Sequence, residues 1–240
     1  MTDEENKISN EAIKYIKSNK KDLVSKFTKE VKSSTSPESY FMAGSPGAGK
    51  TEYSKRFVDG VKKDTGASIV RIDGDEIREI LPQYNGSNSF LFQRAISKGV
   101  DILYDYALHN KLTLLLDTTF CGKQALDNVK RSIDKKRKVY IFYLYQDPLN
   151  SWKLTKARES KEGRMVPIEV FVDHFFTAKD NVNEAKRIFG DKISICLIKR
   201  DCETKSYSFE YNIDKVDNYL KINYTKESLL YDCQGNLEIS

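Results

Sequence analysis

One eight-residue segment constrains the fold of this 240-residue chain more than any other feature. It consists of Gly44, Ser45, Pro46, Gly47, Ala48, Gly49, Lys50 and Thr51. Its glycines let the backbone bend tightly, so that successive N–H groups can point at phosphate oxygens. An apolar run at residues 40–43 precedes the segment, and a helical pattern follows at residues 51–63. This context predicts a strand, a phosphate-binding loop and a helix whose positive end faces the same anion.

Two residues of this loop have separate predicted roles. The Lys50 ammonium is expected to reach the β- and γ-phosphates of a nucleotide, and the Thr51 hydroxyl is expected to bind Mg²⁺. A GTPase would also carry a guanine-reading Asn-Lys-x-Asp sequence and an Asp-x-x-Gly after a strand, and the chain has neither. We therefore expect ATP and Mg²⁺ as cofactors, with GTP as the less favoured nucleotide.

Extended and helical patterns alternate through the rest of the chain, which indicates a parallel sheet with helices on both faces. The expected core strands are residues 40–43, 68–72, 112–116, 138–145 and 193–198. Residues 207–213 predict an edge strand paired with the last of these, and residues 215–224 predict a final helix. The fold class is therefore α/β, with a P-loop kinase-like parallel sheet flanked by helices.

Both ends of the chain extend this core. Residues 4–32 carry apolar side chains at helical spacing and predict one or two amphipathic helices. A helix-breaking linker, SSTSP, follows at residues 33–37. The expected organisation is an N-terminal helical extension at 1–36, a P-loop kinase core at 37–200, and a strand and helix extension of the same domain at 201–240.

Acidic residues follow several of the expected strands, where ligands bind in parallel sheets. Asp73 and Asp75 come after the 68–72 strand, Asp117 ends the 112–116 strand, and Asp147 follows the 138–145 strand. A kinase needs a carboxylate to deprotonate its acceptor hydroxyl, but Asp73 also suits a helix N-cap and Asp75 a first helical turn. Asp117 fits a position near Mg²⁺ or a contact to a sugar hydroxyl.

Two arginines, Arg158 and Arg164, flank a charged segment that contains Gly163. The glycine and the charges predict a mobile lid between helices. Phosphoryl transfer spreads negative charge over the equatorial oxygens, which lid arginines can stabilise. Solvated arginines at helix ends are the alternative interpretation.

Charge and cysteine content exclude several functions. The net charge is +5, and the densest basic run, residues 130–138, is interpreted as a solvated helix end, so a nucleic-acid partner is not expected. The four cysteines form no CxxC pair, which argues against zinc and for reduced thiols.

No signal-peptide core is present, and the longest apolar run, residues 139–145, is too short to span a bilayer. We expect a cytoplasmic protein without a membrane partner.

An ordered set of landmarks resembles one known family. The set comprises residues 44–51 with Pro46, Ile72-Asp73-Gly74-Asp75, Asp101 sixteen residues before Asp117, Asn150-Ser151-Trp152, Arg158, and Arg164 with Pro167 three residues later. In this order the landmarks resemble the zeta toxins, the P-loop kinases of epsilon/zeta toxin–antitoxin pairs, over about residues 20–200.

The resemblance implies an activity, a partner and roles for individual residues. Zeta toxins use ATP and Mg²⁺ to phosphorylate the 3′-hydroxyl of UDP-N-acetylglucosamine, and they pair with a protein antitoxin. By resemblance, Asp75 is the general base, Lys50 the phosphate-binding lysine, and Arg158 and Arg164 the paired lid arginines. Asp101 stands where the family has a substrate-binding Glu, and Thr119 matches a Thr that follows the central strand. The chain has Asp117-Thr118-Thr119 where the family has Glu-Gly-Thr.

Other functions remain open from the sequence alone. The acceptor could be another small hydroxyl compound, such as a different UDP-sugar or an antibiotic. A binding module that uses its nucleotide only as a switch would carry the same loop. A polynucleotide kinase is disfavoured because no cluster of basic and aromatic residues is present.

Overall fold

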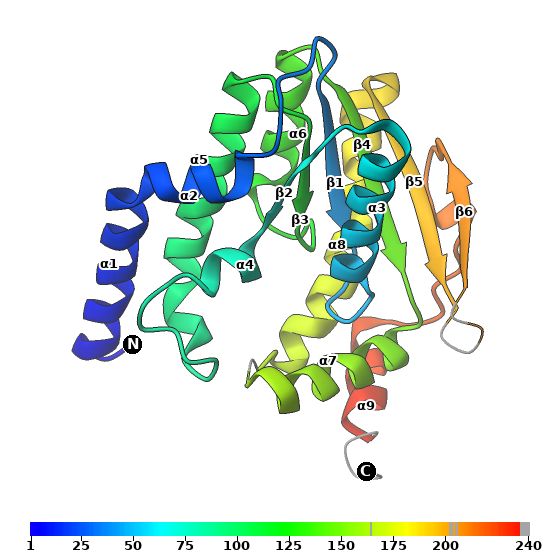
Figure 1. Ribbon diagram of the computed structural model, residues 1–240. Coiled ribbons are helices and arrows are strands. Elements are labelled where there is room, and N and C mark those ends of the chain that lie inside the picture. Colours follow the sequence, from blue (N-terminus) through cyan, green and yellow to red (C-terminus); the bar gives the residue numbers. More distant parts are fainter. Residues whose placement is uncertain (164, 202–203, 205, 236–240) are drawn as a thin grey trace.

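The computed structural model of the chain describes residues 1–163, 165–201, 204 and 206–235. Its centre is a six-stranded sheet with the strand order β2-β3-β1-β4-β5-β6 (Figure 1). The first five strands are parallel, and β6 runs antiparallel to β5. Helices cover both faces of this sheet. The structure therefore confirms the expected α/β class, the parallel five-stranded core and the edge strand beside β5, and it shows that this edge strand is antiparallel.

The strands lie close to their expected positions. Their bounds are β1 Glu38–Ala43, β2 Val70–Asp73, β3 Leu114–Asp117, β4 Lys138–Tyr145, β5 Ile193–Arg200 and β6 Tyr207–Tyr211. The helices are α1 Asp3–Ser18, α2 Lys20–Thr28, α3 Lys50–Thr65, α4 Gly74–Arg78, α5 Gln93–His109, α6 Gln124–Asp134, α7 Pro148–Glu162, α8 Ile168–Phe189 and α9 Lys226–Gly235. Short 3-10 turns occur at Ser89–Phe92, Gly190–Lys192 and Val216–Asn218.

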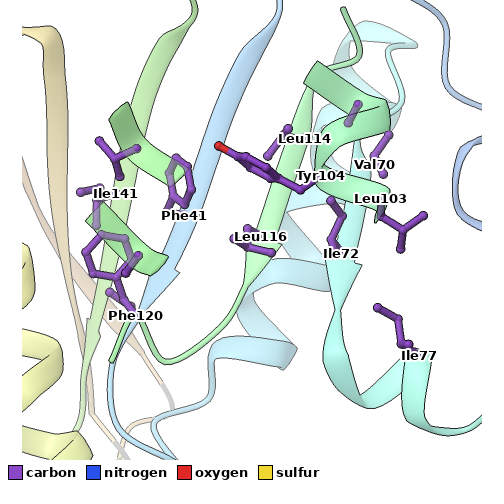
Figure 2. Packing of buried hydrophobic residues seen from close by; sticks show 14 of the residues in the cluster. Phe41, Val70, Ile72, Ile77, Leu103, Tyr104, Leu114, Leu116, Phe120 and Ile141 are labelled. Carbon is purple, nitrogen blue, oxygen red and sulfur yellow. The ribbon is translucent and has the colours of Figure 1, made fainter. Parts of the chain in front are cut away.

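Alternate side chains of each strand point to opposite faces of the sheet, so the hydrophobic core has two parts. On one face, Phe41, Leu114 and Leu116 pack with side chains of α5, such as Leu103 and Tyr104 (Figure 2). Helices α6 and α8 cover the rest of that face. On the opposite face, the intervening strand residues pack with α3. Because neighbouring residues of a strand point to opposite faces, the short apolar runs supply both cores at once.

The N-terminal helices belong to the same core as the sheet. Ile16 of α1 and Leu23 of α2 are buried in the cluster that includes α5. Gly99 of α5 leaves room for Ile77 of α4, since a Cβ at this position would lie 2.9 Å from an Ile77 methyl carbon, whereas its 3.7 Å separation from Ile16 would be an ordinary contact. Figure 1 shows α1 and α2 beside α5, away from β6. The domain boundaries at 36/37 and 200/201 stay predictions.

The expected helix at residues 215–224 is wrong. The structure has a 3-10 turn there instead, at Val216–Asn218; Val216 is buried in the main core, and its N–H donates to Asn183 on α8 (2.8 Å). The tail helix is α9, ten residues later. Thr225 and Ser228 cap it reciprocally, each backbone N–H donating to the other's hydroxyl (3.0 and 3.1 Å).

Two further findings concern the described residues alone. Cys121, Cys196 and Cys233 form no disulfide, and Cys202 lies outside the described part of the chain. None of the helices in that part combines the length and the apolar character needed to cross a membrane.

Candidate active site

The glycine-rich loop connects β1 to α3 at the carboxyl edge of the sheet. Three of its glycines have positive φ angles, 138° at Gly44, 74° at Gly47 and 92° at Gly49. A Cβ on Gly47 would lie 2.0 Å from the carbonyl oxygen of Ser151, and one on Gly44 would lie 2.4 Å from that of Leu144. Both positions therefore require glycine for steric as well as conformational reasons.

Lys50 is the first residue of α3 and Thr51 is the second. The Lys50 ammonium folds back over the loop and donates to the carbonyl oxygens of Gly44 (2.8 Å) and Ser45 (2.7 Å). A helix N-terminus, inward-bent glycines and a lysine over the loop together suit a nucleotide phosphate. The loop also contacts the neighbouring strand end, because the Gly44 N–H donates to the carbonyl oxygen of Thr119 (3.2 Å).

Asp73 and Asp117 lie opposite each other on the neighbouring strands β2 and β3. Arg71 lies between them and donates through Nη2 to Asp73 (2.5 Å) and to Asp117 (2.6 Å). The Ser54 hydroxyl, one turn into α3, donates to Asp117 (2.7 Å) and accepts from Arg71 Nε (2.8 Å). A buried ionic network therefore connects the first helix after the loop with two strand ends.

Asp73 was expected to be either a catalytic carboxylate or a helix N-cap, and the structure shows it capping a helix. Its Oδ1 accepts from the N–H of Asp75 (2.9 Å) at the start of α4. Burial and the facing Asp117 carboxylate raise the pKa of Asp73 from 3.8 to about 6, against the opposing effect of Arg71. Asp147 is also a cap, since its side chain accepts from Leu149 and Asn150 at the start of α7.

Asp75 projects from the first turn of α4 and has an arginine on each oxygen. Oδ1 is ion-paired with Arg78, a buried side chain of the same helix, and Oδ2 accepts from Arg158 of α7 (2.8 Å). The structure thus brings the predicted base and one predicted lid arginine together, although they are 83 positions apart in the sequence. Arg164 lies outside the described residues.

The remaining predicted residues occupy different surroundings. Asp101 lies in the middle of α5, where burial raises its pKa and where the charges acting on it belong to Lys98, Asp105 and Arg131. Within the described part of the chain, no hydrogen bond joins Asp101 to the loop or to Asp75. Thr119 lies directly beside the loop.

Four site residues were not predicted from the sequence. They are Ser54, Arg71, Arg78 and Arg200. Arg200 ends β5, pairs with Glu52 (3.4 Å) and lies over the loop, so that a Cβ on Gly49 would come within 2.5 Å of its Nη1. The sequence offers one signal for these four residues, because Arg71 is a charged residue between the apolar Val70 and Ile72.

Solved structures of other proteins share the fold of this chain. Among solved structures, a chain of the PezAT chromosomal toxin–antitoxin system of the human pathogen Streptococcus pneumoniae superposes with a TM-score of 0.60 at 19% identity, covering 99% of this chain and 96% of that one. The AvrRxo1-ORF1:-ORF2 complex with ATP also gives 0.60, at 13% identity, covering 91% of this chain and 74% of that one. At these identities the likeness shows a shared fold.

Sequence comparison identifies the family. No curated protein sequence matches the chain significantly. The family model for the zeta toxin matches residues 21–212, which is most of the 240 residues. This chain therefore belongs to the zeta toxin family and has a P-loop kinase fold.

Proposed function

We propose that the chain is an ATP-dependent kinase that phosphorylates a sugar hydroxyl of a UDP-N-acetylglucosamine-type sugar nucleotide. The observation that carries the proposal is the placement of Asp75 at the same edge of the sheet as the phosphate loop, with Arg158 bound to it at 2.8 Å. A base, a phosphate-binding loop and a cation that stabilises the transferring group are parts that phosphoryl transfer to a hydroxyl uses. Membership of the zeta toxin family supports the same reaction class.

In this proposal, the loop of residues 44–51 holds the nucleotide phosphates. Lys50 exchanges its two loop carbonyls for β- and γ-phosphate oxygens, and Thr51 is the proposed Mg²⁺ ligand. Bound Mg²⁺ would neutralise charge on the phosphates. Asp117 and Thr119 are proposed to contact the acceptor at the neighbouring strand end, and Asp117, which accepts from Ser54 one turn after Thr51, would help to hold bound Mg²⁺. Asp101 is proposed as a further substrate contact.

Asp75 accepts the proton of the acceptor hydroxyl as the new oxygen–phosphorus bond forms and ADP departs. Arg78 and Arg158 occupy the two oxygens of this carboxylate, so one of them must leave before Asp75 can accept a proton. We infer that Arg158 moves from Asp75 to the transferring phosphoryl group when substrates bind. Arg164 is proposed to act with it.

We also propose that the protein acts in the cytoplasm as the toxin of a toxin–antitoxin pair. The structural neighbour PezAT is a toxin–antitoxin system. Expression of the wild type in bacteria should stop growth, whereas Lys50→Ala and Asp75→Asn variants should not. Normal growth at high wild-type levels would refute toxicity and leave the kinase proposal standing.

Mass spectrometry of a UDP-sugar panel incubated with protein, ATP and Mg²⁺ tests the proposed reaction. A product heavier by one phosphoryl group, absent with Asp75→Asn, supports it. If only a different small hydroxyl compound were phosphorylated, the chain would be a kinase for that class of acceptor instead. ATP hydrolysis that no acceptor stimulates would indicate a nucleotide switch instead of a kinase.

A further inference from the structure

We propose that Arg71 is the positioning residue of this site, which fixes the helix that carries Asp75 relative to the phosphate-binding loop. The inference rests on the proposed function, because it gives Arg71 a role in the same reaction. Arg71 lies in β2, outside the motifs from which the site was predicted. Only 9% of its side chain is exposed, so its charge acts inside the protein.

Every nitrogen of the Arg71 guanidinium has a partner. Nε donates to the Ser54 hydroxyl (2.8 Å), Nη1 to Glu76 (2.5 Å), and Nη2 to both Asp73 (2.5 Å) and Asp117 (2.6 Å). These partners come from α3, α4 and the ends of β2 and β3. A planar guanidinium can serve so many elements because its donors point in several fixed directions.

On the acceptor side, Arg71 holds α4 at two points. Asp73 binds Arg71 with Oδ2 and caps α4 with Oδ1, which accepts the N–H of Asp75. Glu76, the next residue of α4, binds Arg71 directly. The Asp75 carboxylate is therefore flanked in sequence by two residues that are attached to the same guanidinium.

On the nucleotide side, Arg71 reaches the helix that begins with Lys50. Ser54 accepts from Arg71, and its oxygen lies 2.7 Å from Asp117 Oδ2 and 3.0 Å from the carbonyl oxygen of Thr51. Its single hydroxyl proton serves the nearer carboxylate. Arg71 thus connects the turn that carries Thr51 with the turn that carries Asp75.

The carboxylates around position 71 require an arginine there. Asp73 and Asp117 face each other across β2 and β3, so without Arg71 two buried carboxylates would repel. A lysine ammonium has one centre of charge and cannot bind Ser54, Asp73 and Glu76 in the same geometry. Arg71→Lys should therefore keep the fold and lose most of the positioning.

The experiment compares Arg71→Lys and Arg71→Met with Arg187→Met, which removes an exposed arginine paired with Glu184 on α8. Acceptor phosphorylation is measured in the wild-type and Asp75→Asn backgrounds. We expect both Arg71 variants to lower kcat by about a hundredfold, the cost of a misplaced reacting group, with the KM for ATP within about threefold. On the Asp75→Asn background the further loss should be under about threefold, because Arg71 acts through Asp75. Arg187→Met should match the wild type.

Hydrogen exchange of the backbone amides at residues 75–79 is the second measurement, and it needs no acceptor. Exchange there should accelerate at least about tenfold in Arg71→Lys, while the α8 amides stay unchanged. If Arg71→Met does not fold, Arg71→Met with Asp73→Asn replaces it, since this pair removes one of the opposed charges and keeps a capping oxygen.

Equal losses of activity in both backgrounds, or unchanged exchange at residues 75–79, would overturn the role of Arg71. A loss confined to the KM for ATP would also overturn it. Wild-type protein that phosphorylates no acceptor would instead refute the proposed function, and the exchange measurement would still decide whether Arg71 holds α4.

Discussion

Replacement of Asp75 by Asn should stop acceptor phosphorylation and leave the nucleotide site intact. Asn keeps the shape of the side chain and one carbonyl oxygen, but it has no basic oxygen to take the acceptor proton. The wild-type carboxylate is bound by Arg78 on one oxygen and by Arg158 on the other. The substitution therefore also removes the negative charge that lies between two arginines.

The two effects differ in size. Loss of a general base lowers the rate by about 10² to 10⁴, and the lower figure corresponds to about 2.7 kcal/mol in the activation barrier. The ion pair with Arg78 is buried on the arginine side, so its loss should cost about 1–3 kcal/mol of folding free energy. A 240-residue domain should tolerate that cost. The loop holds the phosphates through other residues, so ATP affinity should stay near the wild-type value.

Asp73→Asn is the matched control. Asn can still cap α4 through its carbonyl oxygen, and it removes a charge that faces Asp117. The substitution also removes the ion pair between Asp73 Oδ2 and Arg71, so we expect the free energy of unfolding to fall by about 1–3 kcal/mol, with far more activity retained than in Asp75→Asn. Both variants would be compared by calorimetry with ATP, by melting temperature and by product formation.

The reasoning would be refuted by the opposite pattern. A well-folded, inactive Asp73→Asn beside a fully active Asp75→Asn would place the base at Asp73. Full activity in both variants would show that acceptor activation does not occur at this strand end.

Three further changes have definite expected results. Lys50→Ala should lower turnover at least about tenfold, a barrier increase above ~1.4 kcal/mol, and a smaller loss in steady-state kinetics would contradict its phosphate role. Arg158→Ala and Arg164→Ala should each lower kcat more than they raise the KM for ATP, and a pure KM effect from both would assign them to ground-state binding. The raised pKa of Asp73 means that the folded protein holds this proton more tightly than the unfolded chain. Its contribution to stability is therefore present below about pH 4 and lost as the pH rises through about 6; melting curves should show this loss in the wild type and not in Asp73→Asn.

Local chemistry made much of the fold predictable. The glycine loop and the apolar strands follow from short-range patterns, and β4 has the expected bounds. The tail was mispredicted, because residues 215–224 contain only a 3-10 turn, Val216 packs in the core, and the helix begins at Lys226. The Thr225 and Ser228 cap was visible in the sequence and marks the true start of α9.

The sequence alone determined which groups could handle phosphate, because the loop from Gly44 to Thr51 is contiguous and its function depends on local backbone bends. Only the tertiary structure decided which groups the charged side chains bind. Arg137, expected in a solvated basic run, is buried and donates to Ser39 and to backbone carbonyl oxygens. Arg71 and Arg158 reach carboxylates on other strands and helices. Long side chains such as these bind groups that are distant in the sequence, so their partners cannot be inferred from sequence spacing.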